Sequence, residues 1–333
     1  MDRPRLSVII PYYRGADSIG EAVASVRAQT LAADEIVIVD DGSPDDLEAA
    51  LGEAAAGIKI VRKPNGGISS AMNAATEAAS GDFLVQLDQD DVFMPGRLEA
   101  VAAAAGANPE ADVIATDAIV EFDGADVARI GALSPLEVPD PREAILRRCY
   151  ILWPAVRRTR LQAIGGYDES FPVMQDWDCF IRLLISGAPV AVVPEPLYRW
   201  RLTPGSRSSS DGVENAEALI RLMEKTAGNP DLRPSERQIV AENLASQHRR
   251  MALERAHLAV ETGARDARRR SLDLVTGAGF SLSSRVKAAV AVVSPRLAAR
   301  FIEARAARDP GAEALSRRGF GRSTDSIGDR KNL

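Results

Sequence analysis

The chain of 333 residues contains little cysteine and little histidine: Cys149, Cys179, His248 and His257 are the only such residues. So few thiol and imidazole groups argue against a structural zinc site, and two isolated cysteines do not make a disulfide framework. Because both histidines lie in the last third, a Ser–His or Cys–His nucleophilic site within residues 1–247 is excluded. Any general base in that region is therefore expected to be a carboxylate.

A long hydrophobic run is also absent. The apolar stretch near the N-terminus is too short for a secretory signal. The apolar run at residues 286–293 falls far short of the roughly 20 residues that a membrane-spanning helix needs. We therefore expect a cytoplasmic protein, and the sequence leaves open a peripheral contact with the inner face of the cell membrane.

An excess of positive charge is lacking too, because the net charge is −6. An acidic protein has no general attraction for nucleic acid, so no nucleic-acid partner is expected. The charge is spread unevenly: residues 211–333 carry 22 Lys and Arg against 16 Asp and Glu, whereas residues 1–210 carry 19 against 31. The basic part fits either solvated helices packed on the first domain or a surface that adsorbs to anionic lipid.

The first 200 residues alternate short, β-branched apolar runs with helical patterns. This alternation predicts an α/β domain with a mostly parallel sheet flanked by helices. Ser43, followed by Pro44, is expected to cap a helix. We expect strands at residues 6–10, 35–39, 58–61, 83–87, 112–120 and 190–193, and the last of these is expected to lead into a loop.

The strand pattern stops at a Gly/Ser-rich stretch near residues 205–212. We therefore predict three parts: an α/β domain at residues 1–210, a helical and basic region at residues 211–318, and a flexible tail at residues 319–333. Within the basic region, residues 286–307 alternate apolar and arginine positions as an amphipathic helix does.

Three carboxylates crowd the end of a predicted strand in the segment Asp88-Gln89-Asp90-Asp91. Such crowding is costly unless a cation or hydrogen-bond donors neutralise it, and Mg²⁺ or Mn²⁺ held by one or two carboxylates and a diphosphate fits. An acidic loop that caps the next helix is the alternative. The acidic pair Asp40-Asp41 ends another strand, where open α/β sheets bind nucleotides, with helix capping as its alternative.

Further polar and aromatic side chains follow strands or begin helices. Tyr13 follows the first strand, where its ring suits stacking on a nucleobase. The glycines within residues 63–73 allow close approach to a ligand, or simply make a turn. Asp176 lies at the start of a predicted helix. The helix dipole would keep its carboxylate ionised, which suits a general base, but an ordinary helix cap explains the residue equally well. Arg199 and Arg201 suit phosphate neutralisation or pairing with surface acids.

The order of these motifs is more specific than any one of them. PYYRG, VDDGS, NGGISSAMN, DQDD, and GGYDES with QDWD follow one another. This series resembles glycosyltransferase family 2, the inverting sugar-nucleotide transferases of GT-A fold. The resemblance implies a glycosyltransferase that moves a hexosyl group from a UDP-, GDP- or dTDP-linked sugar to a hydroxyl acceptor. A lipid-linked glycan in cell-surface glycan assembly is one candidate acceptor.

The resemblance also assigns roles to individual residues. Asp176 matches the catalytic base, and Asp90 matches the ligand of Mn²⁺ or Mg²⁺. Asp41 matches the aspartate that contacts the nucleobase, with Asp40 structural, and Asp88 matches the residue that faces the ribose. The residues assigned to nucleotide-sugar binding are Pro11, Tyr13, Asp41, Asn65, Gly67, Asp88, Gln89 and Arg199.

Three positions depart from the family pattern. Gln175 stands where many members have Glu before the base, and the loss of that anion is expected to ease ionisation of Asp176. Met72 replaces an arginine, and Trp200-Arg201 replaces the usual histidine after the Tyr-Arg element. One alternative is a sugar nucleotidyltransferase, but PYYRG is a poor match to the Gly-rich, cationic loop that follows the first strand in such enzymes. The other alternative is a catalytically silent sugar-nucleotide-binding or scaffold protein.

Overall fold

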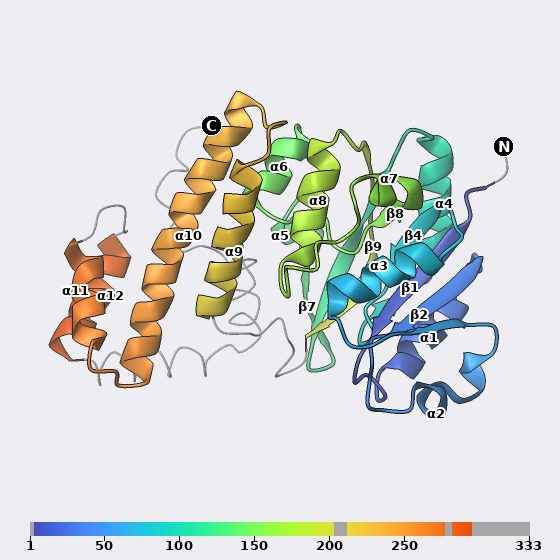
Figure 1. Ribbon diagram of the computed structural model, residues 1–333, viewed down its shortest axis with the longest axis horizontal. Coiled ribbons are helices and arrows are strands. Elements are labelled where there is room, and N and C mark those ends of the chain that lie inside the picture. The colour runs from blue at the N-terminus through green and yellow to red at the C-terminus, as the bar shows by residue number, and fades with distance from the viewer. Residues whose placement is uncertain (1–2, 203–211, 277–281, 295–333) are drawn as a thin grey trace. The chain divides into compact units, whose positions relative to one another are not determined.

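The computed structural model describes residues 3–202, 212–276 and 282–294 (Figure 1). The chain divides into two compact units, one made of residues 1–202 with 229–239 and the other of residues 203–228 with 240–333. The tail predicted at residues 319–333 lies outside the described residues, as does the part of the predicted amphipathic helix beyond residue 294.

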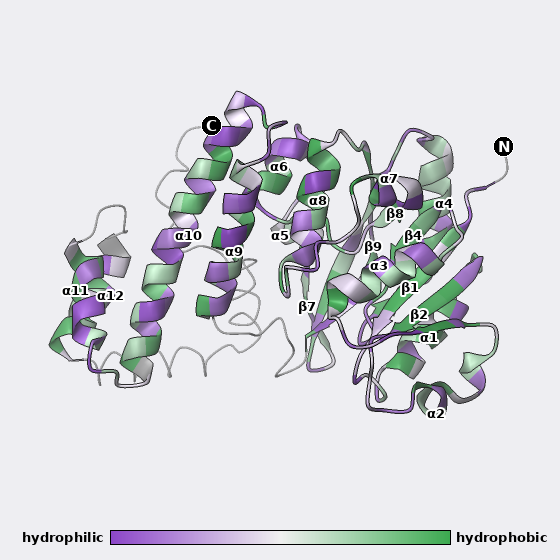
Figure 2. Ribbon diagram, in the orientation of Figure 1, coloured by the Kyte–Doolittle hydropathy of each residue, from purple (hydrophilic) through white to green (hydrophobic). Residues whose placement is uncertain are grey.

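One half of the sheet is parallel, as predicted. The order is β3 (Lys59–Arg62), β2 (Glu35–Asp40), β1 (Leu6–Tyr12), β4 (Phe83–Gln86), and every neighbouring pair is parallel. All seven residues of β1 are buried, which is why this strand reads as a continuous apolar run. Figure 2 shows β1, β2 and β4 as mostly hydrophobic.

The other half of the sheet is mixed. Beyond β4 come β8 (Ala155–Arg157), β6 (Val113–Phe122), β9 (Val190–Leu202) and β5 (Val92–Phe93), and β7 (Ala125–Arg129) pairs with β6. The β4–β8, β8–β6, β6–β7 and β9–β5 pairs are antiparallel, whereas β6 and β9 run parallel. The fold is therefore an α/β sheet with a parallel half and a mixed half.

Helices cover the sheet and bury apolar residues against it. In Figure 1, α3 lies across β1 and β2, beside α7. The sheet-covering helices of this unit are α1 (Ile19–Arg27), α3 (Ile68–Ala78), α4 (Arg97–Ala107), α7 (Arg158–Ala163) and α8 (Gln175–Ile185). Its shorter helices are α2 (Leu47–Leu51), the 3-10 turn η1 (Gly52–Ala55), α5 (Ile130–Leu133) and α6 (Pro141–Arg147).

The structure corrects two local predictions. Asp46, not Ser43, caps α2, because its carboxylate accepts the Ala49 N–H at 3.0 Å, while the Ser43 hydroxyl is held by Asp45. The segment after residue 193 is not a loop: β9 continues to Leu202, because its second half pairs with both β6 and β5. The short strands β5 and β7 were not predicted. β5 has only two residues and β7 is mostly exposed, so neither shows a clear apolar pattern in the sequence.

Residues 229–239 belong to the first unit because a buried carboxylate ties them to α6. Glu236 is fully buried, and the Arg142 guanidinium donates to both of its oxygens at 2.7 and 2.8 Å. The Arg233 N–H also donates to it at 2.7 Å. A buried charge is tolerated when it is paired and hydrogen-bonded in this way.

The second unit is helical, with α9 (Gly212–Ala227), most of α10 (Pro234–Glu261), α11 (Ala267–Thr276) and α12 (Leu282–Val293). The end of α10 packs with α11 and α12 through apolar side chains such as Ala256, Leu274 and Ala288. Among the described residues, no helix is long and apolar enough to cross a bilayer.

The central position of β1 predicts a large difference between two valines of the first unit. Val8 in β1 is fully buried, and Val127 in β7 is 42% exposed. Val8→Ala is expected to lower the free energy of unfolding by about 2 kcal/mol or more, from lost apolar burial and the cavity left behind. Val127→Ala is expected to change it by no more than about 0.5 kcal/mol. Urea unfolding of both variants is the measurement, and equal losses would contradict the central role of β1.

Candidate active site

The carboxyl ends of the parallel strands bring the predicted motifs to one edge of the sheet. Tyr12 in β1 lies beside Asp40 in β2, and Asp40 lies beside Arg62 in β3. On the other side, Ile9 of β1 lies beside Gln86, the last residue of β4. The loops that follow these four strands therefore meet where open α/β sheets bind their ligands.

Gln89 joins the acidic loop after β4 to the loop after β1. Its side-chain oxygen accepts the Tyr13 N–H at 2.8 Å, and its side-chain nitrogen donates to the Tyr13 carbonyl at 3.0 Å. The neighbouring Gly15 is buried against this amide, and a Cβ there would lie 2.5 Å from Gln89. Gln89 thus fixes the backbone that carries the Tyr13 ring.

The loops after β1 and β2 are joined in the same way. The Tyr12 hydroxyl donates to Asp45 at 2.8 Å, and Asp45 also accepts the Ala16 N–H at 3.1 Å. The Arg14 N–H donates to the Ser43 hydroxyl at 2.9 Å. Burial and the hydrogen bond to Asp45 raise the pKa of Tyr12 to about 12, so this contact is made by a neutral phenol.

Asp41 holds the glycine-rich segment that precedes α3. Its carboxylate accepts the Lys63 ammonium at 2.6 Å and the N–H groups of Gly66 and Gly67 at 3.0 and 2.8 Å. The Asn65 side chain donates to the Asp41 carbonyl at 2.9 Å. Gly67 has a φ of 84°, a conformation that glycine adopts without strain. Both oxygens of Asp41 are therefore used to hold this segment.

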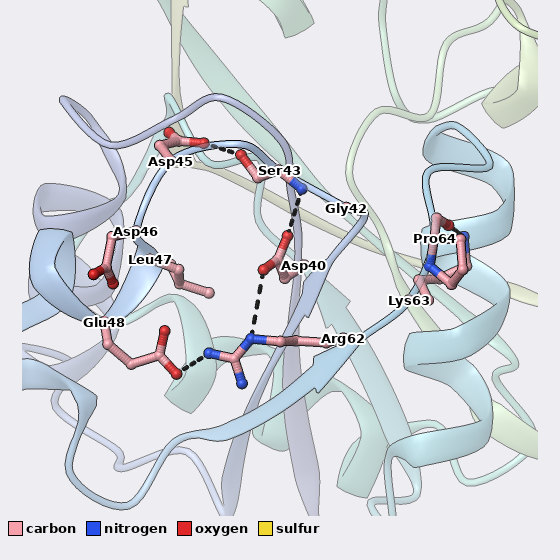
Figure 3. A pocket seen from close by; sticks show the side chains of 10 residues that line it. All are labelled: Asp40, Gly42, Ser43, Asp45, Asp46, Leu47, Glu48, Arg62, Lys63 and Pro64. Atoms are coloured by element: carbon pink, nitrogen blue, oxygen red, sulfur yellow. Dashed lines mark hydrogen bonds and ion pairs between the residues drawn. The ribbon is translucent and has the colours of Figure 1, made fainter.

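Asp40 faces a cavity of about 500 Å³ beside α2 (Figure 3). One of its oxygens accepts the Ser43 N–H at 2.8 Å, and the other lies 3.8 Å from the Arg62 guanidinium, which also pairs with Glu48. The structure thus places Asp40, not Asp41, at the cavity, although the resemblance assigned the nucleobase contact to Asp41. Lys63 lines the same cavity.

In the acidic loop, Asp91 is buried and Asp88 is partly buried. Asp88 accepts from the Gln86 amide and from the Trp153 indole, both at 2.9 Å. Burial, together with the charges of Asp90 and Asp176, raises the pKa of Asp88 to about 6. A carboxyl group with this pKa is poised to gain or lose a proton near neutral pH.

Asp91 is held more tightly than Asp88. It is 2% exposed, and it accepts the Tyr198 hydroxyl and the Arg201 N–H, both at 2.8 Å. Burial and the charges of Asp88 and Asp90 raise its pKa. With both oxygens bonded to β9, Asp91 anchors the acidic loop rather than facing the crevice.

Asp176 lies in the first turn of α8, and its carboxylate accepts the Trp177 N–H at 2.8 Å. The helix dipole was expected to favour its ionised form, but burial dominates and raises the pKa of Asp176. The absence of an anion at Gln175 does not reverse this effect. Its neighbour Asp178 is buried and pairs with Arg182 at 2.7 Å, so it stabilises α8.

The arginines of β9 pair with acids in the structure. Arg199 binds Glu121 at 2.8 Å and also Asp126. Arg201 binds Glu21 at 2.6 Å. This is the alternative that the sequence left open for both, and Arg199 is not brought to the nucleotide loops as a free guanidinium.

The acidic loop offers a cation few protein ligands. Among the residues that the structure describes, no group of three His, Cys, Asp or Glu side chains is arranged to hold a metal ion. Asp90 is partly exposed in the acidic loop, and its charge contributes to the raised pKa of Asp88 and Asp91. This donor set suits a hard cation that takes its remaining ligands from a diphosphate and water.

Most of the predicted site residues gather at this edge, and two contacts there were not predicted. Pro11 is buried in β1, and Tyr13, Asn65, Gly67 and Gln89 lie in the joined loops. The clamp of Lys63 on Asp41 and the bond of Trp153 to Asp88 were missed. Lys63 begins the predicted glycine-rich segment, but the sequence does not indicate its pairing with Asp41, 22 positions away. Trp153 belongs to no short motif and lies 65 positions from Asp88, so no local signal indicates that contact.

Comparison with known proteins identifies the family. The sequence model described as glycosyl transferase family 2 matches residues 7–141. An uncharacterized glycosyltransferase from Haemophilus influenzae is 30% identical over 230 residues, which is 66% of this chain and 84% of that protein. The amylovoran biosynthesis glycosyltransferase AmsE from Erwinia amylovora is 28% identical, over 59% of this chain and 75% of its own length. The chain belongs to glycosyltransferase family 2.

Other relatives are much longer than the matched region. The chain spans 23% of the uncharacterized protein y4gI from Sinorhizobium fredii and 37% of an uncharacterized glycosyltransferase from Rickettsia felis. What those whole proteins do therefore does not define this chain.

Solved structures confirm the GT-A fold. TarS 1–349 from S. aureus in complex with UDP-GlcNAc has a TM-score of 0.61 at 18% identity, with 92% of each chain covered. The mannosyltransferase PcManGT from Pyrobaculum calidifontis in complex with GDP-Man and Mn²⁺ has a TM-score of 0.59 at 18% identity, covering 96% of this chain and 85% of that chain.

The close fit of Gly15 against Gln89 yields a test. In Gly15→Ala the new methyl group displaces the end of the Gln89 side chain and breaks both of its bonds to Tyr13. The expected loss is about 1–2 kcal/mol of unfolding free energy, because each such bond contributes about 0.5–1.5 kcal/mol net. Gln89→Ala is expected to lose a similar amount, and the double variant little more than either, as measured by urea unfolding.

Gly106→Ala is the matched control for this test. No atom lies within 4 Å of the position that a methyl group would take at Gly106, and the residue is within α4. Alanine there is expected to be neutral or to stabilise the protein by up to about 1 kcal/mol. Additive losses in the Gly15–Gln89 double variant would show that the two residues do not act through one contact.

Proposed function

We propose that this protein is a metal-dependent, inverting glycosyltransferase that moves a sugar from a nucleoside diphosphate to a hydroxyl acceptor. The observation that carries the proposal is the proximity of two partly buried carboxyl groups from separate motifs: the charge of Asp176 contributes to the raised pKa of Asp88. A general base and the acidic loop thus share one site at the edge of the sheet.

The donor's nucleotide fits the loops after β1, β2 and β3. The Asp40 cavity accepts N–H or hydroxyl donors of a base or ribose, and the Tyr13 ring offers a stacking surface. The related folds TarS and PcManGT are in complex with UDP-GlcNAc and GDP-Man, which supports a UDP- or GDP-linked donor here. A dTDP-linked donor remains within the same class.

The proposed transfer step uses Asp176 as the general base. The acceptor oxygen forms a bond to the anomeric carbon as Asp176 takes its proton. The bond from that carbon to the diphosphate oxygen breaks, and the nucleoside diphosphate leaves with the electron pair. Attack on the face opposite the leaving group inverts the anomeric configuration.

A divalent cation completes the site in this proposal. Asp90 is the residue that would hold Mn²⁺ or Mg²⁺, which would neutralise the charge that develops on the diphosphate. PcManGT is in complex with Mn²⁺, and the crowding of Asp88, Asp90 and Asp91 supports the same need for positive charge. Asp88 is then left to face the ribose.

The acceptor and the location are proposed from the relatives and from composition. AmsE acts in amylovoran biosynthesis and RfbC from Myxococcus xanthus is named for O-antigen biosynthesis, so we propose a role in cell-surface polysaccharide assembly. The free thiols Cys149 and Cys179 support a cytoplasmic setting. The basic residues of α11, among them Arg268 and Arg269, support a peripheral contact with anionic lipid.

Replacing the proposed base tests the activity. In Asp176→Asn the proton acceptor is lost, and kcat is expected to fall at least about a hundredfold, with the donor dissociation constant within about twofold of the wild type. Donor binding is measured by thermal shift with UDP-, GDP- and dTDP-sugars, with and without Mn²⁺. Transfer is measured as nucleoside diphosphate release.

Asp123→Asn is the control for the loss of one negative charge. Asp123 is exposed and has a φ of 53°, a conformation that asparagine tolerates, so wild-type activity is expected. Unchanged turnover in Asp176→Asn would contradict the base assignment. Release of pyrophosphate from a nucleoside triphosphate and a sugar 1-phosphate would instead identify a nucleotidyltransferase, and binding of a sugar nucleotide without turnover in the wild type would identify a silent sugar-nucleotide-binding protein.

The raised pKa of Asp176 gives a second test of its role. A general base acts as the carboxylate, so kcat/KM is expected to rise with pH through the pKa of Asp176 and then to level off. Because burial raises that pKa above 3.8, the rising limb is expected at a higher pH than for an exposed aspartate. Initial rates between about pH 4 and 8 check this, with circular dichroism as the control for unfolding. A flat profile would count against Asp176 as the base.

A further inference from the structure

Trp153 has a strained backbone that its surroundings hold in place. Its φ is 45°, in the left-handed region that bulky residues rarely adopt. Such strain persists only where several contacts fix it, most often at functional sites. The contacts of Trp153 lead directly to the acidic loop.

The Trp153 side chain is fixed by two partners. Its indole N–H donates to Asp88 at 2.9 Å. Its ring stacks on Tyr198 with a centroid distance of 4.3 Å and an angle of 8° between the planes. Tyr198 in turn binds Asp91, so the indole is attached to the acidic loop at both Asp88 and Asp91.

A buried arginine fixes the backbone of Trp153. Arg97 is completely buried, and its guanidinium donates to the Trp153 carbonyl and to the Thr116 hydroxyl. It lies over the rings of Phe93 and Tyr198, 4.7 and 5.1 Å from their centroids. Burial lowers the pKa of Arg97 to about 10, so it remains a cation at neutral pH and holds these contacts.

Trp200 extends the aromatic surface beside Trp153. The two indole centroids are 5.3 Å apart, with the planes tilted by 58°. Both indole side chains are partly exposed to solvent, although the neighbouring ring of Tyr198 is buried. We name the two indoles the aromatic pair.

The sheet order places the aromatic pair opposite the proposed nucleotide site. The nucleotide loops follow β1, β2 and β3, which lie on one side of β4. Trp153 precedes β8 and Trp200 belongs to β9, both on the other side of β4. Asp88, just past the end of β4, stands at the boundary and bonds to Trp153. An acceptor that attacks a donor held at β1–β4 approaches from the side of the aromatic pair.

We propose that Trp153 and Trp200 form the acceptor subsite and that the acceptor is a carbohydrate, bound by a pyranose ring lying on the indoles. This inference rests on the proposed function and names the chemical class of its acceptor. The C–H bonds on one face of a pyranose match the negative face of an indole, while its hydroxyls suit hydrogen-bond acceptors such as the proposed base, Asp176. An alkyl chain has no hydroxyl groups along its length, and a peptide backbone has no such C–H face.

The test compares acceptors and three forms of the full chain. The donor is the sugar nucleotide that gives the largest thermal shift, and the acceptors are methyl and octyl glycosides of glucose, galactose and mannose. Dodecanol and a Ser/Thr peptide are the non-carbohydrate hydroxyls. Trp200→Leu removes the aromatic face, and Trp200→Phe keeps one. Nucleoside diphosphate release is measured with and without each acceptor.

A pyranoside is expected to stimulate nucleoside diphosphate release. Trp200→Leu is expected to raise the KM for that acceptor about tenfold, whereas Trp200→Phe stays within about threefold of the wild type. The KM for the donor is expected to change less than about twofold in both variants. A merely structural role of Trp200 would not separate the two KM values, and thermal midpoints check that both variants fold.

Two results overturn the aromatic pair alone. The first is an acceptor KM in Trp200→Leu equal to that of the wild type. The second is a donor that is bound and hydrolysed, while nucleoside diphosphate release is stimulated only by dodecanol, only by the peptide, or by none of the compounds. A wild-type protein that neither binds nor hydrolyses any sugar nucleotide would instead overturn the proposed function, and with it this inference.

Discussion

The parallel pairing of β1 with both β2 and β4 is the constraint on which the site depends. Since neighbouring strands in the order β3-β2-β1-β4 run the same way, four loops from distant parts of the sequence leave the sheet at one edge. Each of these loops carries polar side chains, which the parallel pairing brings to the same edge. Burial of the whole of β1 supplies the free energy that holds this pairing.

Most of the polar side chains at this edge bind the protein itself. Asp41 holds the glycine-rich segment, Gln89 holds the Tyr13 backbone, and Asp91 holds Tyr198. Preorganised loops of this kind lose little entropy when a ligand binds. The carboxyl groups proposed to act on a substrate are few: those of Asp40 at its cavity, Asp88, Asp90 and Asp176.

Sequence patterns predicted the fold and the location of the site better than the roles of its residues. Continuous apolar runs identified the parallel strands, because β1 and its neighbours are buried on both faces. The patterns did not show that Asp46 caps α2 or that β9 continues past residue 193, since both depend on partners distant in sequence. Burial of Asp176 was also hidden, because the helix dipole is visible in the sequence and desolvation is not.

The two hydrogen bonds between Gln89 and Tyr13 connect the proposed cation site with the proposed nucleobase site. Gln89 is adjacent to Asp90, the proposed cation ligand, while Tyr13 is the proposed stacking surface for the nucleobase. Ordering one of these residues therefore orders the other through a single side chain. Under the proposed function, any effect of a base stacked on Tyr13 on cation binding equals the effect of the cation on nucleotide binding, because coupling between two ligands is reciprocal. The contact between Gln89 and Tyr13 is the route through which donor and metal binding would be coupled.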